Sequence, residues 1–249
     1  MSNSADTTMG DQLTKPSEGW AAELTGGAVD LSDLREMLAA PFEPWVEDYE
    51  FDGETVLLLR SVEWKGFSDA AELNERAGLL LTRINGAKRI AFEDSRTVAL
   101  GRTFRFNADG DLLPFTLSMS VNTSIGEIGS RTRGRLDDGL PKVPAPSPLQ
   151  ARLKAAEDSE RHADLLTHIA RADNWYDLYK AMEQVERING TGKRWDVMIG
   201  SEDRQWSDAK QTANSYRHAY HPTKNRPPNN PPSLAEARSL LLRVARRVV

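Results

Sequence analysis

The side chains with the most chemical capacity gather near the end of the sequence, between Gln211 and Arg226. They comprise two of the four histidines together with tyrosine, asparagine and basic residues: Asn214, Tyr216, Arg217, His218, Tyr220, His221, Lys224 and Arg226. An arginine can hold a phosphate group through two parallel hydrogen bonds. A histidine, whose pKa is ordinarily about 6.5, can move a proton at neutral pH. These residue types together could bind a polynucleotide, or cleave RNA without a metal ion.

The spacing brings the catalytic candidates together if residues 203–220 form one helix. Arg217 lies three positions after Asn214 and four before His221, and His218 lies four after Asn214. Such pairs share a helix face. Arg217 would then hold a phosphate while His218 or His221 acts as the acid–base. The remaining polar and aromatic side chains are predicted to line the surrounding binding surface: Asn214, Tyr216, Tyr220, Lys224 and Arg226.

This arrangement resembles the HEPN family of helical-bundle proteins, many of which are metal-independent ribonucleases of bacterial defence and toxin–antitoxin systems. In that family a histidine follows an arginine by about five to seven positions, and the site forms across a dimer. Here Arg217 and His221 are four positions apart, His218 replaces the usual asparagine, and Pro222 follows His221. The resemblance covers only the C-terminal helical half. It implies a helical bundle and a ribonuclease site at Arg217, His218 and His221.

The same side chains also suit a structural role. Polar side chains at the end of a helix often satisfy free carbonyl groups, and a histidine there interacts favourably with the helix dipole. On this interpretation Arg217 and His218 brace the proline-rich loop at 222–232 against the helices.

A second polar group has the spacing of a metal site. Glu160, Asp164 and His168 succeed one another at four-residue intervals, and a carboxylate and a histidine so placed can bind a divalent metal. With Arg161 and Arg171 close by, an exposed charge network is the favoured interpretation. The sequence lacks a P-loop, a dinucleotide fingerprint and the common hydrolase motifs, and it has no cysteine. We therefore predict no metal and no cofactor.

The net charge of −5 hides an asymmetry between the two halves. Residues 1–145 carry 15 basic and 24 acidic side chains, whereas residues 146–249 carry 17 basic and 13 acidic ones. From Tyr216 onward, seven basic side chains are opposed by Glu236 alone. This split indicates either a basic face for an anionic partner, with RNA as the candidate, or mutual attraction of the two halves.

Composition and hydropathy predict a soluble location. The first 19 residues lack the apolar core of a secretory signal, and no apolar run reaches the roughly 18–20 residues of a membrane span. With no cysteine, these features favour a cytoplasmic protein without a membrane partner. Arginine outnumbers lysine by 23 to 9, which is typical of GC-rich bacterial genomes.

The hydrophobic pattern predicts the elements that must position these residues. Helices are expected at 31–40 and at 68–85, where Asp69 can cap the first turn. Strands are expected at 44–53, as the acidic edge of a sheet, and at 55–62, 88–92, 97–106 and 112–121. Four further helices are expected at 149–170, 175–189, 203–220 and 233–248. The tetrapeptide Arg-Ile-Asn-Gly occurs at 83–86 and at 187–190, and is predicted to end a helix in both places.

We therefore predict an α+β fold in which an N-terminal antiparallel sheet with one or two helices precedes an all-helical bundle of about four helices. The expected divisions are a disordered leader at 1–20, an α+β domain at 31–130, a Gly/Pro-rich linker at 131–148 and a helical domain at 149–249.

The sequence supports two functional hypotheses. In the first, the chain is a non-catalytic interaction protein that binds a protein partner or a second copy through its acidic domain. The basic C-terminal part of the chain contacts an anionic partner such as RNA. In the alternative, the chain is a HEPN-like metal-independent ribonuclease, which requires a histidine beside a pocket able to hold a phosphate.

Overall fold

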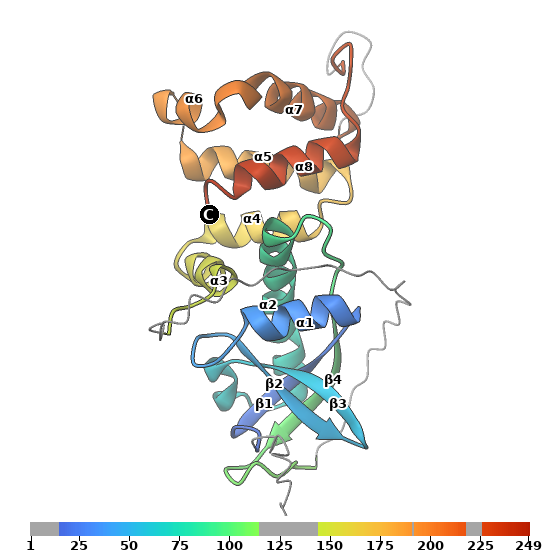
Figure 1. The fold of residues 1–249 in the computed structure, drawn as a ribbon, viewed down its shortest axis with the longest axis vertical. Coiled ribbons are helices and arrows are strands. Elements are labelled where there is room, and N and C mark those ends of the chain that lie inside the picture. The colour runs from blue at the N-terminus through green and yellow to red at the C-terminus, as the bar shows by residue number, and fades with distance from the viewer. Residues whose placement is uncertain (1–14, 115–143, 191, 218–225) are drawn as a thin grey trace, which may run out of the picture.

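The computed structural model describes residues 15–114, 144–190, 192–217 and 226–249, and it confirms the predicted α+β class (Figure 1). The first half is built from four strands and two α-helices: β1 (Gly19–Thr25), α1 (Ala28–Met37), β2 (Trp45–Phe51), β3 (Glu54–Arg60), α2 (Ala70–Ala91) and β4 (Ala99–Phe106). A short 3-10 helix, Val62–Gly66, comes after β3. The strands form one antiparallel sheet in the order β2-β3-β1-β4, so β2 is an edge strand, as its acidic sequence predicted.

The central strand β1 escaped sequence analysis. It begins at Gly19, inside the range assigned to the leader, and Trp20 is buried. Two alanines and a glutamate give β1 little β-propensity of its own, so it is stabilised by pairing with β3 and β4 on its two sides. Residues 1–14 of the expected leader lie outside the described residues.

Helix α2 is longer than predicted, and the strand expected at 88–92 is its last turn. Asn85 does not end the helix, because its side chain donates to the Val98 carbonyl at 2.8 Å and accepts from the Val98 amide at 2.9 Å. Gly86 lies where α2 crosses the helical half: a Cβ atom there would stand 2.0 Å from the carbonyl oxygen of Leu166. Gly86 therefore allows α2 to pack closely against the helical half, and it does not end the helix as a left-handed cap.

The helical half holds six described α-helices: α3 (Pro148–Asp158), α4 (Glu160–Ala170), α5 (Trp175–Asn189), α6 (Lys193–Ile199), α7 (Asp203–Arg217) and α8 (Leu234–Ala245). A short 3-10 helix, Gly200–Glu202, lies between α6 and α7. The single helix expected at 149–170 is two, because Ser159 takes an extended conformation between α3 and α4. The short α6 was not predicted. Within the described ranges, no helix combines the length and the apolar character needed to cross a bilayer.

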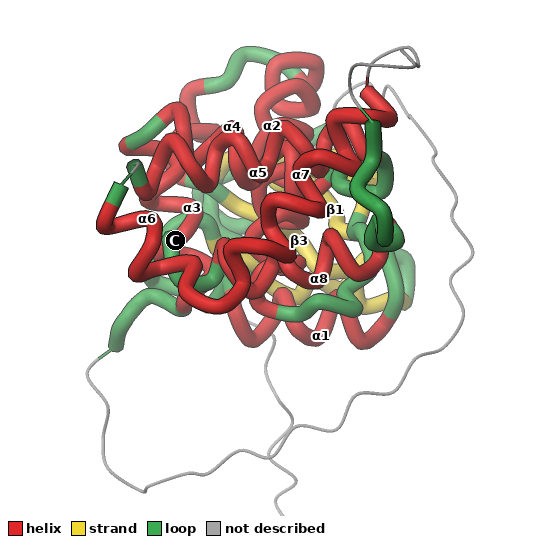
Figure 2. The backbone as a smooth tube through the Cα atoms, turned by 90° about the horizontal axis from the view of Figure 1, so that it is seen from above, coloured by secondary structure: helices red, strands yellow, loops and turns green. Residues whose placement is uncertain are grey.

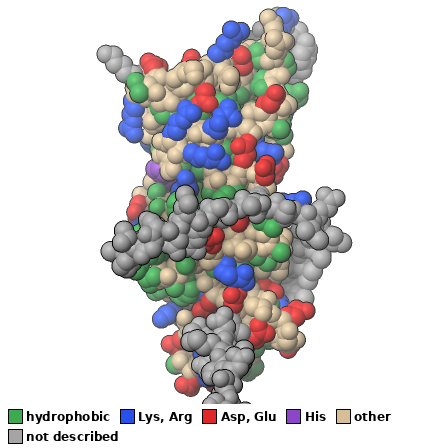
Figure 3. All heavy atoms as spheres, in the orientation of Figure 1, with side chains coloured by type: hydrophobic (Ala, Val, Ile, Leu, Met, Phe, Trp, Pro, Cys, Tyr) green, Lys and Arg blue, Asp and Glu red, His purple; other side chains and the backbone are tan. Residues whose placement is uncertain are grey.

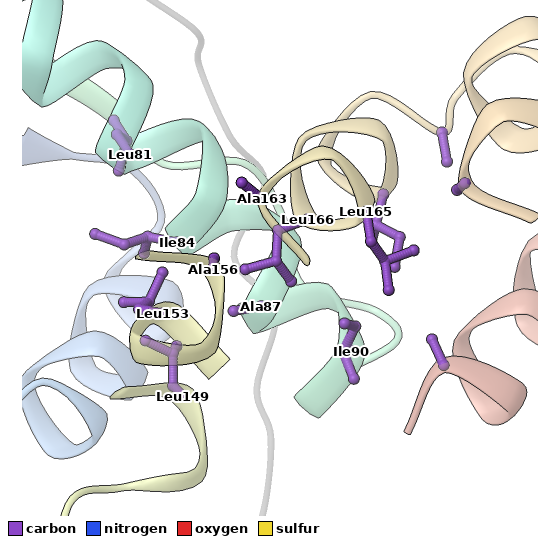
Figure 4. Close-up of a cluster of buried hydrophobic side chains, with 14 of the residues drawn as sticks. Leu81, Ile84, Ala87, Ile90, Leu149, Leu153, Ala156, Ala163, Leu165 and Leu166 are labelled. Carbon is purple, nitrogen blue, oxygen red and sulfur yellow. The ribbon is translucent and has the colours of Figure 1, made fainter. Parts of the chain in front are cut away.

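The helices stack in layers on the end of α2 (Figure 1). Seen from above, they lie over the sheet (Figure 2). One cluster of buried apolar side chains runs from the sheet into the helical half, and Figure 4 shows Ile84 and Ala87 of α2 close to Leu153 and Leu166. Most of the predicted linker at 131–148 and of the strand at 112–121 lies outside the described residues, and the division into domains stays a prediction.

Candidate interaction surface at the end of helix α7

Helices α5 and α7 run in opposite directions and are joined by a ladder of aromatic and ionic contacts. At the start of α7, the Trp206 indole donates to Glu186 at 3.0 Å, and the Lys210 ammonium also donates to Glu186. The ring of Trp206 meets the ring of Trp195 edge-on, with centroids 5.4 Å apart. These contacts fix the rotation of α7 on α5.

The middle of the ladder is the ring of Tyr179. The Arg217 guanidinium carbon lies 4.3 Å from its centroid, and the Lys210 nitrogen lies 5.7 Å from it. A cation over an aromatic ring gains about 0.5–1 kcal/mol at an exposed site. Tyr179 therefore holds Arg217, the predicted phosphate ligand, against α5.

The upper end of the ladder is an aromatic stack. The ring of Tyr216 lies parallel to the ring of Trp175, with an interplanar angle of 2° and a centroid distance of 5.3 Å. Tyr216 keeps 67% of its surface exposed, whereas Trp175 is half-buried. Trp175 thus supports one face of the tyrosine ring, and much of the remaining surface of Tyr216 is open to solvent.

The basic character of this region shows in the pKa of Glu183 on α5. Partial burial by itself raises this pKa, but the hydrogen bond from Lys180, at 3.1 Å, and the charges of Lys180, Arg187 and Arg217 hold it below its ordinary value. The local field therefore favours negative charge.

The structure describes four of the eight candidate residues: Asn214, Tyr216, Arg217 and Arg226. The other four lie outside the described residues: His218, Tyr220, His221 and Lys224. Asn214 and Arg217 belong to one helix, as predicted. The carbonyl of Arg226 accepts a hydrogen bond from the Gln211 side chain at 2.7 Å, so the chain returns to α7 after residues 218–225.

Two of the three side chains in the candidate metal group on α4, Asp164 and His168, have separate partners. His168 bonds through Nδ1 to Asp177 at 3.0 Å, and Asp164 accepts from Gln184 at 3.3 Å. Within the described ranges, no three His, Asp or Glu side chains are grouped so as to hold a metal ion.

Sequence analysis missed Trp175 and Tyr179, which support the two candidate residues Tyr216 and Arg217. A signal was present, because these aromatics stand four positions apart at the start of a helix capped by Asn174 and so share a face. What the sequence did not show was which helix lies opposite that face.

Comparison with known proteins gives no homologue: no family model, curated protein or solved structure matches the chain. The HEPN resemblance therefore stays a prediction carried by the sequence alone.

Proposed function

We propose that this chain is a non-catalytic interaction protein whose helical half binds single-stranded RNA. The observation that carries the proposal is the stack of Tyr216 on Trp175, because an exposed aromatic ring that is supported from behind can stack on a nucleobase. Base stacking on a protein ring contributes roughly 1–3 kcal/mol and tolerates any sequence, since every base has a flat face.

Preorganisation supports the same proposal. Tyr216 is held by Trp175, and the neighbouring Arg217 is held by Tyr179, so a bound strand meets side chains whose positions are already restricted. The cation lies next in sequence to the ring, which suits a backbone phosphate beside a stacked base.

Charge distribution points the same way. The helical half carries the positive excess of the chain, and in Figure 3 Lys and Arg side chains gather over that half of the visible face. Asp and Glu side chains are the more numerous around the sheet half. A polyanion would meet attraction at the helices and repulsion at the sheet, which orients it toward the helical half.

The acidic sheet half is proposed to contact a protein partner or a second copy of the chain. Two of its large apolar side chains, Val62 and Leu79, are about half exposed, at 55% and 50%. Leu79 lines one cleft together with Ser61 and Glu63, the sequence neighbours of Val62. Light scattering of the purified chain decides whether a second copy is the partner.

The test of RNA binding is fluorescence anisotropy with a labelled oligouridine and, in parallel, a duplex of equal length. Tyr216→Ala should weaken oligouridine binding about tenfold, because a stacked ring is lost. Tyr216→Phe should restore it. Tyr176→Ala is the matched control, since Tyr176 is 53% exposed but comes directly after Trp175 and so projects from another side of α5.

Binding of oligouridine that is equal in wild type and Tyr216→Ala would contradict the proposal, as would absence of binding. Affinity should also fall steeply as salt rises, since phosphate contacts release counterions.

A further inference from the structure

A polar pocket of about 400 Å³ lies on the junction of the two halves and shares no residue with the surface at the end of α7. Its walls come from the end of α2, the loop after α2, the loop before α5, and α8. Its charged lining residues are Arg89, Glu93, Asp94, Arg96, Asp173 and Arg238, and Ser95 adds a hydroxyl group.

The loop that forms the floor of this pocket is fixed by buried polar side chains. Asp30 accepts from the Arg96 amide at 3.0 Å, and Lys88 donates to the Arg96 carbonyl at 2.6 Å. Asn85 pairs with both backbone groups of Val98. Asp30, Lys88 and Asn85 are each at most 5% exposed, and burying such groups is costly unless they are bonded. Their bonds give the loop one shape.

One wall of the pocket is cationic. The Asp173 carboxylate takes bonds from Arg89, at 2.8 and 3.2 Å, and from Arg238, at 2.7 Å. Two guanidinium groups on one carboxylate leave a surplus positive charge. In the described part of the chain Arg238 bonds only through Nη1, so its other N–H groups remain available.

The other side of the pocket offers acceptors and an unused hydroxyl. Among the described residues, the Glu93 and Asp94 side chains have no hydrogen-bond or ion-pair partner. Ser95 is 7% exposed, and its buried hydroxyl also lacks a partner there. A serine hydroxyl can both donate and accept a hydrogen bond, so Ser95 adds a neutral polar group to the lining of the pocket.

We propose that this pocket binds a small zwitterion that carries a carboxylate and an ammonium group, as a free amino acid does. The carboxylate lies against Arg89 and Arg238, the ammonium faces Glu93 and Asp94, and the Ser95 hydroxyl completes the bonds. A dianion such as phosphate is disfavoured by Glu93 and Asp94, which have no arginine partner among the described residues, and a simple cation is disfavoured by the three arginines of the lining. This pocket shares no residue with the proposed RNA-binding surface, so it can bind its ligand whether or not the chain binds RNA.

The test is thermal denaturation of the full chain with each of the twenty free amino acids at about 10 mM, a concentration that saturates a site with a millimolar Kd. At least one amino acid should raise Tm saturably, by about 3 °C. Its N-acetyl derivative lacks the ammonium and its amide lacks the carboxylate, so each should bind about tenfold more weakly.

Two variants place the site. Arg238→Gln should weaken binding about tenfold, and Ser95→Ala should weaken it severalfold while preserving the fold, since the hydroxyl makes no bond within the described protein. Arg243→Gln is the control: it makes the same charge change on α8 at a residue that pairs with Glu202, outside the pocket. No saturable shift with any amino acid would overturn the proposal. Binding of either derivative as tightly as the parent amino acid, or unchanged binding of that amino acid by Arg238→Gln, would do the same.

Discussion

The tetrapeptide Arg-Ile-Asn-Gly occurs in two helices of this molecule and has opposite roles in them. In α2 it is interior: Asn85 and Gly86 are buried, and the helix continues through Ala91. In α5 it is terminal: Gly190 is exposed and takes a φ of +81° as the helix ends. The same four residues therefore continue one helix and end the other.

The difference comes from the residues after the tetrapeptide and from the elements packed opposite it. After Gly86 the chain places Lys88 and Arg89, which reach Asp30 and Asp173 in other parts of the fold. After Gly190 comes Gly192, a second glycine with positive φ, and nothing lies within 4 Å of an added Cβ at either glycine. Distant partners, and not the tetrapeptide itself, decide whether the helix continues.

The largest effect on stability is expected at Lys88, whose side chain is fully buried and whose Nζ lies 2.9 Å from Oδ1 of Asp30. Lys88→Met leaves a buried carboxylate without its cation and should lower the free energy of unfolding by about 3–5 kcal/mol. Lys180→Met on α5 removes a partly exposed pair with Glu183 and should cost less than about 1 kcal/mol. Urea denaturation measures both variants. Equal losses in the free energy of unfolding would show that α2 does not depend on its buried distant partner more than α5 depends on its local ion pair.

The next effect is expected at Gly86. Gly86→Ala improves helix propensity by about 1 kcal/mol, but the new methyl group overlaps the Leu166 carbonyl, and a net loss of about 3 kcal/mol should result. Gly78→Ala is the matched control in the same helix, where nothing lies within 4 Å of an added Cβ. It should gain about 0.5–1 kcal/mol. If both variants were stabilised in urea denaturation, α2 would not cross α4 at Gly86.

A smaller loss is expected at Gly190. Gly190→Ala meets no neighbouring atom, but its φ of +81° with ψ of −173° is a conformation that only glycine adopts readily. Backbone strain should lower the free energy of unfolding by about 1–2 kcal/mol. If Gly190→Ala and Gly86→Ala lowered the free energy of unfolding equally in urea denaturation, the steric clash at Gly86 would not cost more than the backbone strain at Gly190, contrary to this expectation.

The smallest effect concerns pH. Partial burial raises the pKa of Asp173, but the hydrogen bonds and charges of Arg89 and Arg238 outweigh it and hold this pKa below its ordinary 3.8. Because the folded state binds the proton less tightly, the ion pairs stabilise fully above about pH 4, and that stability is lost as pH falls through the folded pKa. Asp173 is 58% exposed, so the loss should be about 0.5 kcal/mol. Asp173→Asn should abolish this part of the acid dependence, and a variant with the full wild-type dependence would contradict it.

Helix-capping residues and the pattern of charged residues in the sequence predicted those helices and strands that are stabilised by contacts between residues close in the sequence. Asp69 accepts from two amides in the first turn of α2, as predicted, and Ser233 with Glu236 forms a capping box at the start of α8. Strand β2 was assigned correctly to the sheet edge because an edge tolerates its charges.

The features that were missed depend on residues far apart in the sequence. Strand β1 has weak propensity and is stabilised by strands that come later in the chain, and the last turns of α2 depend on Asp30 and Asp173. The candidate site shows the same division. Tyr216 and Arg217 were found from local spacing, whereas Trp175 and Tyr179 required knowledge of the partner helix.

The most direct test of the proposed function is incubation of the purified chain with total RNA in EDTA, beside a His218→Ala/His221→Ala double variant. A non-catalytic RNA-binding protein leaves the RNA intact in both samples while retarding it in a native gel. Cleavage by the wild type that disappears in a folded double variant would contradict this account and would establish the HEPN-like metal-independent ribonuclease instead.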